Sequence, residues 1–306
     1  MNTVLLPFSA QRRLAEELAP LLDARLGHLD WRRFPDGESL VTIDEALQGA
    51  DAVLLSSLNQ PDALALALRF AAATAREFGA RSVGLVAPYL AYMRQDRRFH
   101  PGEAVSAPLF AAFLQEGVDW LVTVDPHLHR IDRLERIFRI PTRHVAAAPA
   151  VAAWIRTEVV HPLLIGPDGE SAQWVAHIAA LAEAPFQVLH KERRGDRDVS
   201  VSLPDLAAAA GRNPVIVDDI VSSGHTVIET LGHLARLGMP AATVVAIHAV
   251  FAGDAYAALQ AAGAARIVSC DSISHPSNAI ALAKLLAPAC RELLGTDRPA
   301  AARTTA

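Results

Sequence analysis

Short apolar segments alternate with longer amphipathic segments along nearly the whole of this 306-residue chain. Most apolar segments are rich in Val, Ile and Leu and lack a polar–apolar alternation, which is typical of strands buried on both faces of a parallel sheet. We expect strands at Val4–Pro7, Ala52–Leu58, Ser82–Pro88, Trp120–Val124, Leu163–Pro167, Phe186–Leu189, Val215–Val217, Thr243–Val250 and Arg266–Cys270. This order predicts an α/β fold built from βαβ units with right-handed crossovers.

The longer segments between these strands have helical periodicity. We expect helices at Pro61–Phe78, Ala172–Ala182, Thr226–Leu237 and Asn278–Leu294. Glycines follow three of these helices, at Gly79, Gly238 and Gly295, and we place them at the C′ position, where a left-handed residue ends a helix.

The chain has two halves of similar size, separated by a change of composition at Arg139–Pro149. Each half contains a strand that ends in an aspartate-bearing turn, Val122–His127 in the first and Leu164–Glu170 in the second. We therefore expect two doubly wound parallel-sheet domains of related architecture, at residues 1–143 and 144–295. The small and polar residues 296–306 are expected to form a frayed tail.

Composition excludes several classes of protein. The formal net charge is −5, so no global basic surface for nucleic acid exists, and an anionic ligand must be held by local groups. The two cysteines, Cys270 and Cys290, belong to no Cys/His cluster, which excludes a disulfide scaffold and a structural zinc site. The longest apolar run, Ala241–Phe251, is shorter than the about 20 residues that span a membrane. We expect a cytoplasmic protein without nucleic-acid or membrane partners.

The loop after the strand Val215–Val217 is the most informative segment. Two adjacent carboxylates are followed by small hydroxyl residues, a glycine and the start of a helix: Asp218, Asp219, Ser222, Ser223, Gly224, His225 and Thr226. Backbone N–H groups and hydroxyls at a helix N-terminus bind phosphate, and a carboxylate pair accepts hydrogen bonds from sugar hydroxyls or holds a cation. The alternative is a strand end followed by an ordinary helix cap.

These residues resemble the phosphoribosyl diphosphate motif, Asp-Asp-x-x-(Asp/Ser)-(Thr/Ser)-Gly-x-Thr, shared by type I phosphoribosyltransferases and ribose-phosphate pyrophosphokinases. The resemblance implies that all seven residues bind ribose 5-phosphate. Three positions differ from the common bacterial form Asp-Thr-Gly-Gly-Thr: Ser222, Ser223 and His225, where a glycine is usual. His225 leaves open whether the acceptor is ribose 5-phosphate or another sugar phosphate.

Two further segments resemble the pyrophosphokinases rather than the transferases. Arg33–Glu38 is similar to the family's Arg-Phe-x-Asp-Gly-Glu turn, which implies that Phe34, Asp36 and Glu38 contact the adenine of ATP in a neighbouring subunit. An ordinary Asp-Gly turn is the alternative. Pro88–Arg97 is similar to the family's Pro-Tyr-x-x-Tyr-x-Arg-Gln-Asp-Arg loop, which implies that Arg94, Gln95 and Asp96 bind ATP. Arginine suits polyphosphate because it binds phosphate bidentately.

Metal and catalytic residues follow from the same resemblance. Val124–His127 is similar to the family's Val-Asp-Leu-His, with a change at Pro126, and implies that His127 binds ATP and Mg²⁺. Gly166–Glu170 is similar to a Ser-Pro-Asp-x-Gly turn and implies that Asp168 contacts metal or the sugar phosphate. His190–Val199 is similar to a mobile catalytic loop, in which Lys191 and Arg193 stabilise charge on the transferring group. A solvated basic hairpin is the alternative there.

Together the motifs occur in the family's order from Val4 to Ile273. The resemblance implies a Mg²⁺-dependent diphosphokinase that uses ATP and ribose 5-phosphate, with its active site between two domains. A site shared between subunits implies a homo-oligomer built from dimers, with a hexamer as one possibility. The alternatives are a phosphoribosyltransferase and a catalytically silent regulatory relative.

Overall fold

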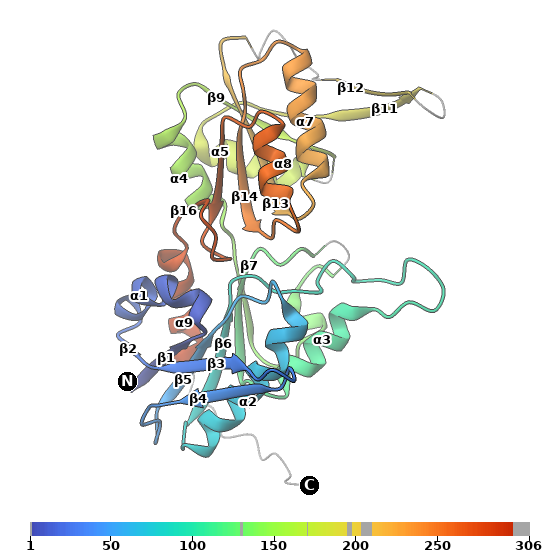
Figure 1. The fold of residues 1–306 in the computed structure, drawn as a ribbon. Coiled ribbons are helices and arrows are strands. Elements are labelled where there is room, and N and C mark those ends of the chain that lie inside the picture. Colours follow the sequence, from blue (N-terminus) through green and yellow to red (C-terminus); the bar gives the residue numbers. More distant parts are fainter. Residues whose placement is uncertain (1, 129–130, 170, 195–197, 203–209, 296–306) are drawn as a thin grey trace. The chain divides into compact units, whose positions relative to one another are not determined.

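The computed structural model describes residues 2–128, 131–169, 171–194, 198–202 and 210–295 (Figure 1). The chain forms two compact units. The first unit consists of Met1–Val145 and Leu282–Ala306, and the second unit consists of Ala146–Ala281. None of the helices in these described ranges is long and apolar enough to cross a membrane.

The first unit contains a parallel sheet with the strand order β2-β1-β5-β6-β7-β8. Its strands are β1 (Thr3–Pro7), β2 (Arg25–Leu26), β5 (Asp51–Leu55), β6 (Ser82–Ala87), β7 (Trp120–Val124) and β8 (Thr142–Val145). The helices that connect them are α1 (Arg12–Leu21), α2 (Pro61–Glu77) and α3 (Ser106–Gln115), with short 3₁₀ turns at Ser9–Gln11 and Leu134–Arg136.

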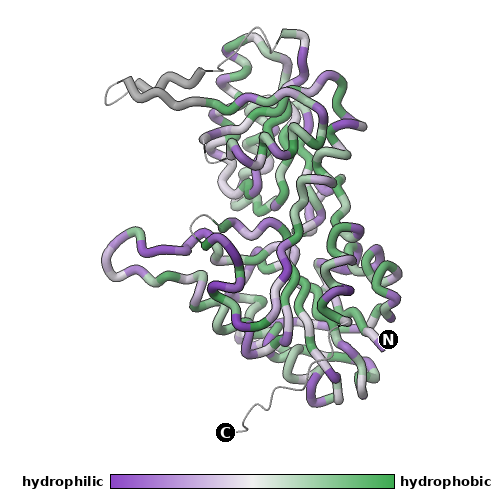
Figure 2. Tube along the Cα trace, turned by 180° about the vertical axis from the view of Figure 1, so that it is seen from behind, coloured by the Kyte–Doolittle hydropathy of each residue, from purple (hydrophilic) through white to green (hydrophobic). Residues whose placement is uncertain are grey.

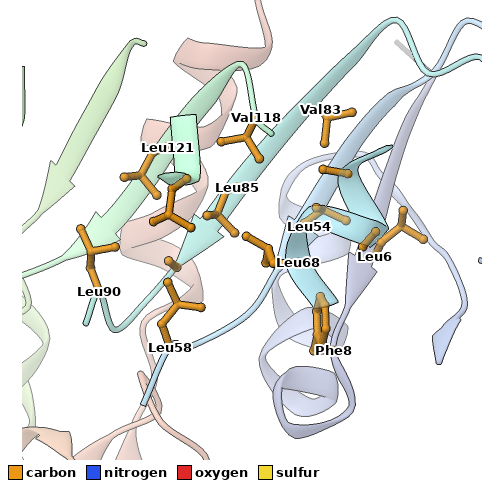
Figure 3. Packing of buried hydrophobic residues seen from close by; sticks show 14 of the residues in the cluster. Leu6, Phe8, Leu54, Leu58, Leu68, Val83, Leu85, Leu90, Val118 and Leu121 are labelled. Carbon is orange, nitrogen blue, oxygen red and sulfur yellow. The ribbon is translucent and has the colours of Figure 1, made fainter. Parts of the chain in front are cut away.

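The core of the first unit is organised by the register of this sheet. Leu6, Leu54, Leu85 and Leu121 are partners on successive strands, so they form one row across the sheet. All four are fully buried and belong to one cluster with Leu68 of α2 (Figure 3). Burying each such side chain contributes about 1.5–3 kcal/mol. This explains why the sequence segments read as continuous apolar runs.

The second unit repeats this topology with the order β10-β9-β13-β14-β15-β16. Its strands are β9 (Pro162–Gly166), β10 (Phe186–Val188), β13 (Asn213–Val221), β14 (Thr243–Ala249), β15 (Arg266–Cys270) and β16 (Asn278–Ile280). Its helices are α4 (Ala148–Glu158), α5 (Ala172–Ala182), α7 (His225–Arg236) and α8 (Ala255–Ala261). Both sheets are doubly wound and parallel, so the predicted fold class is confirmed.

Each unit also carries an antiparallel hairpin at the same point of its topology. In the first unit, β3 (Leu29–Arg33) and β4 (Ser39–Ile43) lie in sequence between β2 and β5. In the second, β11 (His190–Arg194) and β12 (Asp198–Ser202) lie between β10 and β13. The two hairpins hold the predicted adenine-contacting turn and the predicted catalytic residues, respectively.

The C-terminal helix α9 (Ala283–Leu294) differs from the prediction in two ways. It belongs to the first unit, although the sequence placed residues through 295 in the second domain. It packs beside α1 and against β7 and β8, and Arg143 Nε donates to Glu292 Oε2 at 2.9 Å (Figure 1). It also begins at Ala283 rather than Asn278, because Asn278–Ile280 pairs with β15 as β16. The predicted tail, residues 296–306, lies outside the described residues.

Of the three glycines predicted to end helices, two have the expected backbone. Gly79 and Gly238 have φ of +86° and +70°, the left-handed conformation that ends a helix. Gly295 has φ of −78° and is the C-cap of α9, so it is not the left-handed C′ residue that was predicted.

Candidate active site

The loop Ser222–Gly224 connects the buried strand β13 to α7. Asp218 and Asp219 are half-buried near the carboxyl end of β13, and α7 begins at His225. Gly224 has φ of +72°, and a Cβ atom there would lie 3.5 Å from Leu259. Its carbonyl accepts the Ile228 N–H at 2.8 Å, the first turn of the helix. Glycine is therefore required by the backbone conformation at the point where the loop becomes a helix.

This loop lies at a topological switch point of the second sheet. From β9 the chain crosses to β10 on one side, whereas from β13 it crosses to β14 on the other. Ligands of doubly wound folds bind outside the carboxyl ends of the two strands at such a point. Asp168 follows β9 there, and its Oδ1 accepts the Ser171 N–H at 3.0 Å. The structure thus brings Asp168, Asp218 and Asp219 to the carboxyl ends of two neighbouring strands, β9 and β13.

His225 does not point along the helix toward its N-terminus. Its Nε2 lies 3.1 Å from Glu229 Oε1, one turn further into α7, and the histidine side chain is 78% exposed. The ring therefore lies on the solvent-facing side of the first turn. Thr226 is half-buried, and its carbonyl accepts the Thr230 hydroxyl at 2.8 Å.

In the first unit, a long polar loop follows β6 and protrudes from the unit (Figure 2). Tyr92 stands at its base with φ of +67°, and its hydroxyl donates to Asp62 at the start of α2. Gln95 Oε1 accepts the Ser106 hydroxyl at 2.7 Å. Asp96 is half-buried, whereas Arg94 is exposed.

The tip of this loop is held by its own hydrogen bonds. Glu103 accepts the N–H groups of Phe99 and His100 at 3.1 and 2.9 Å, and its carbonyl accepts Arg98 Nε at 2.7 Å. The Arg97 guanidinium lies 4.7 Å from the ring centroid of Phe99. The loop thus presents exposed arginines on a defined backbone, as a polyphosphate site requires.

The carboxyl end of β7 supplies a further acidic group. Asp125 has φ of +31°, and its Oδ1 lies 3.1 Å from Nε2 of His144 on β8. His127, two residues on, is half-buried. Sequence reasoning assigned His127 and gave Asp125 and His144 no role. Asp125 could have been predicted as a candidate, because it is a carboxylate directly after a buried strand. Its contact with His144 could not, because that contact depends on the pairing of β7 with β8.

The turn of the β3–β4 hairpin has the predicted Asp-Gly chemistry. The Gly37 N–H donates to the Phe34 carbonyl at 2.9 Å, and Asp36 Oδ1 accepts the Glu38 N–H at 3.1 Å. Gly37 has φ of +93°, as in a three-residue hairpin loop that ends in a left-handed glycine. Phe34 is 38% exposed, and the Arg32 guanidinium lies 4.6 Å from its ring centroid. The turn therefore displays an aromatic face beside two exposed carboxylates.

The second hairpin carries the predicted catalytic residues on its first strand. In the β11–β12 register, Lys191 is the partner of Val201 and Arg193 that of Val199. Part of the predicted mobile segment, residues 195–197, lies outside the described residues.

Within the described ranges, no group of three or more His, Cys, Asp or Glu side chains forms a metal site. Mg²⁺ usually keeps several waters and takes one or two protein carboxylates together with substrate phosphates. Asp168, Asp218 and Asp219 provide oxygen donors of that kind, and Asp125 does so beside His127.

Two doubly wound parallel sheets, with acidic and hydroxyl-bearing loops at their carboxyl ends, define a phosphoribosyltransferase-like protein. Residues 3–117 match the family model of the N-terminal domain of ribose phosphate pyrophosphokinase, and residues 137–283 match that of the phosphoribosyl transferase domain. The chain belongs to the ribose-phosphate pyrophosphokinase family.

Full-length relatives support this membership. The chain is 32% identical to a ribose-phosphate pyrophosphokinase of Methanothermobacter thermautotrophicus, over 93% of the chain and 98% of the relative. It is 34% identical to one of Halobacterium salinarum, over 94% and 100%. A crystal structure of phosphoribosylpyrophosphate synthetase from Mycobacterium smegmatis has the same fold, with a TM-score of 0.81 at 24% identity, and covers 96% of this chain and 99% of that one.

Proposed function

We propose that this chain transfers the β,γ-diphosphate of ATP to the anomeric hydroxyl of ribose 5-phosphate, giving phosphoribosyl diphosphate and AMP. Family membership over nearly the whole chain supports the reaction. The observation that carries the assignment to residues is the placement of Asp168, Asp218 and the Ser222–Thr226 loop at one switch point. Carboxylates and a phosphate-binding loop at this switch point can bind the hydroxyls and the phosphate of a phosphorylated sugar.

Ribose 5-phosphate binds to the second unit in this proposal. Its phosphate accepts hydrogen bonds from the backbone and hydroxyls of Ser222, Ser223 and Thr226, where the N-terminus of α7 favours negative charge. Asp218 and Asp219 accept hydrogen bonds from the sugar hydroxyls. The bound sugar is thereby oriented, and its anomeric hydroxyl is presented for attack on the β-phosphorus.

ATP binds to residues of the first unit. Arg94, Gln95 and Asp96 hold the nucleotide on the loop after β6, and His127 lies at the end of β7. Phe34 supplies a stacking face for adenine, and Asp36 and Glu38 accept hydrogen bonds from its exocyclic amine. His127 and Asp168 are the residues that would hold Mg²⁺, and the bound ion would neutralise charge on the phosphates of ATP.

Lys191 and Arg193 act on the transferring group. Phosphoryl-group transfer needs cations aimed at the charge that develops on the transferring group and on the leaving phosphate. Both residues occupy one hairpin, so movement of that hairpin brings them to the site together and excludes water. Lys191 and Arg193 also compensate the charge on the phosphate of the leaving AMP.

The enzyme works as a homo-oligomer built from dimers in this proposal, because the Phe34 turn serves ATP bound to a neighbouring subunit. The cytoplasm, where ATP is abundant, is its proposed location. Neither feature changes the chemistry assigned to each residue.

The decisive experiment is an assay of the purified chain with ATP, Mg²⁺ and ribose 5-phosphate that measures AMP and phosphoribosyl diphosphate. AMP release that depends on ribose 5-phosphate, and that is lost in Asp219→Asn, is the expected result. Consumption of phosphoribosyl diphosphate with a nucleobase would instead identify a phosphoribosyltransferase. Absence of both reactions in a folded chain would identify a silent relative.

A further inference from the structure

The backbone of the Ser222–Thr226 loop is fixed by a segment outside the motif. The Phe251 N–H donates to the Val221 carbonyl at 2.9 Å, and the Ala252 N–H donates to the Ser222 carbonyl at 3.1 Å. These two bonds hold the chain where it leaves β13 and enters the loop. The position of the loop therefore depends on the conformation of Phe251.

Phe251 has an unusual backbone conformation for a non-glycine residue, with φ of +34°. Such a conformation persists only where surrounding contacts determine it. Its ring provides those contacts, because it lies 4.8 Å from the ring of His275 and 5.3 Å from that of Tyr256. Tyr256 and His275 are themselves 4.8 Å apart in an edge-on arrangement, so the three rings form a closed cluster.

The His275 ring is in turn held in one orientation. The Ser277 backbone N–H donates to His275 Nδ1 at 3.1 Å, so Nδ1 is the acceptor and the ring hydrogen is on Nε2. The Ser277 hydroxyl lies 2.7 Å from that of Ser269 on β15. The His275 N–H donates to Asn278 Oδ1 at 2.9 Å. The cluster is thus anchored to the β15–β16 edge of the sheet.

We propose that the ring cluster of Phe251, Tyr256 and His275 positions the sugar-phosphate loop, and that His275 and Phe251 are positioning residues for the acceptor substrate. This proposal rests on the assignment of Ser222–Thr226 to ribose 5-phosphate. The hydrogen bonds of the Phe251 and Ala252 N–H groups link the cluster to the loop, so we expect it to act on acceptor binding and to leave ATP binding unaffected. The residues that determine acceptor binding thus reach from β13 and β14 to the β15–β16 edge of the second sheet.

The test compares substitutions at Phe251 in the AMP-release assay. Phe251→Ala is expected to raise the KM for ribose 5-phosphate about tenfold, since a displaced binding group costs up to about a hundredfold, with the KM for ATP unchanged. Phe251→Tyr keeps the ring and should restore the KM. Phe251→Gly removes the ring but adopts positive φ freely, so it should fall between the two. His275→Ala should act in the same direction as Phe251→Ala.

A matched control is Trp154→Ala on α4, whose ring packs under the Arg266 guanidinium at 4.8 Å near the opposite end of β15. It should change neither KM. If Phe251→Ala is unfolded by circular dichroism, His275→Ala provides the same comparison. Unchanged KM for ribose 5-phosphate in both folded variants would overturn the proposal, as would an equal loss for both substrates.

Hydrogen exchange separates this proposal from the assignment of the loop. Amides of residues 219–226 and 251–252 should exchange faster in His275→Ala than in the unsubstituted chain without any substrate. If they do, but Asp219→Asn leaves the KM for ribose 5-phosphate unchanged, the cluster positions the loop and the loop is not the acceptor site. If exchange is unchanged in His275→Ala, the positioning role is wrong whatever the loop binds.

Discussion

His225 occupies the position at which this sequence differs most from the motif it resembles. The ring lies beside Glu229 on the exposed side of α7, so a phosphate at the helix N-terminus would be bound mainly by backbone N–H groups and hydroxyls. We therefore expect His225→Gly to change the affinity for ribose 5-phosphate by less than about twofold, because its pairing with Glu229 is an exposed one. Calorimetric titration between about pH 5 and pH 8, where histidine changes charge, measures this.

Glu229→Gln serves as the control for His225, since it removes the charge of Glu229 and keeps the imidazole. An affinity that falls with rising pH in the unsubstituted chain and is flat in His225→Gly would show that the ring turns to the phosphate on binding. Several-fold higher activity of His225→Gly on ribose 5-phosphate would point to another phosphorylated sugar as the acceptor.

His233, two turns further along α7, links stability to pH. Burial, followed by the charge of Arg236, lowers the pKa of its imidazole below the ordinary value. The unfolded chain then binds more protons, so the stabilisation by neutral His233 is complete above about pH 6.5 and is lost as pH falls toward the folded pKa. We expect His233→Leu to reduce the loss of Tm between about pH 7.5 and pH 5.5 by a few degrees.

The His233 variant should not remove the pH dependence entirely, because burial lowers the pKa of His275 as well. Among the residues that the structure describes, the buried His233 Nε2 has no hydrogen-bond partner, so the leucine variant should also be at least as stable as the original at neutral pH. A steeper loss of Tm in acid would contradict the assignment of the effect to this residue.

At the residue scale, the sequence indicated those candidate site residues whose neighbours are close in the chain. Asp218, Asp219 and Gly224 follow one strand and precede one helix, so a local pattern of strand, turn and helix cap locates them. The contacts of Asp125 with His144 and of Phe251 with His275 join separate segments. No local pattern encodes such pairs, because they depend on the register of the sheet.

The loop between β6 and α3 is held at its base by Tyr92. The hydrogen bond to Asp62 and burial raise the pKa of the Tyr92 hydroxyl, which therefore remains a donor at neutral pH. The ring also lies 4.8 Å from that of Phe110. We expect Tyr92→Phe, which keeps the ring and removes the donor, to raise the KM for ATP about threefold to tenfold, matching the about 1 kcal/mol of a typical hydrogen bond.

Asp62→Asn is the matched test of that anchor, because it removes the charge at the other end of the same hydrogen bond. Both variants should leave the KM for ribose 5-phosphate unchanged. A rise in that constant, or an unchanged KM for ATP in both, would mean that the anchor does not position the nucleotide loop.

The β11–β12 hairpin is expected to contribute mainly to the transition state. Lys191→Ala should lower kcat by about a hundredfold or more, the usual cost of removing one group that stabilises developing charge. The affinity for ribose 5-phosphate should change less than about twofold, because the interaction is strongest in the transition state. Steady-state kinetics with calorimetric binding checks both values. An unchanged kcat would remove Lys191 from the mechanism, and Lys191→Arg tests whether charge alone suffices.

Elements with continuous apolar runs were predicted well, and those defined by long-range pairing were not. β7, β15 and α5 match their predicted bounds. The predicted helix at Asn278–Leu294 was wrong at its start, because Asn278 Nδ2 instead donates to Ser269 Oγ and the Cys270 carbonyl and ties β16 to β15. The helical pattern of α9 was visible, but the strand before it exists only through its neighbour.

At the scale of the whole molecule, the two units are versions of one topology, and this explains where α9 belongs. In the second unit, α4 precedes the first strand β9 and packs beside α5. In the first unit, α9 is the helix that packs beside α1 (Figure 1). The C-terminal helix thus completes the unit that starts the chain. Composition and periodicity could not predict this, since the division of a sequence into halves assumes contiguous domains.

The same duplication gives the two hairpins corresponding positions, and the proposed function gives them different roles. The β3–β4 hairpin displays Phe34, and the β11–β12 hairpin carries Lys191. If Phe34 serves ATP in a neighbouring subunit while Lys191 serves its own, each complete site combines residues of two chains. A dimer of Phe34→Ala with Lys191→Ala would then contain one site with both substitutions and one with neither.

Mixing these two inactive or weakly active variants is therefore expected to restore activity. With random exchange of subunits, half of the dimers are mixed and one site in two is intact, so roughly a quarter of the original activity should return. The measurement is AMP release before and after mixing, with subunit exchange shown independently by a size tag on one variant. Mixing Phe34→Ala with Asp219→Asn should give the same recovery if ribose 5-phosphate binds beside Lys191 of the same chain. No recovery after proven exchange would mean that Phe34 contacts adenine within its own chain or not at all.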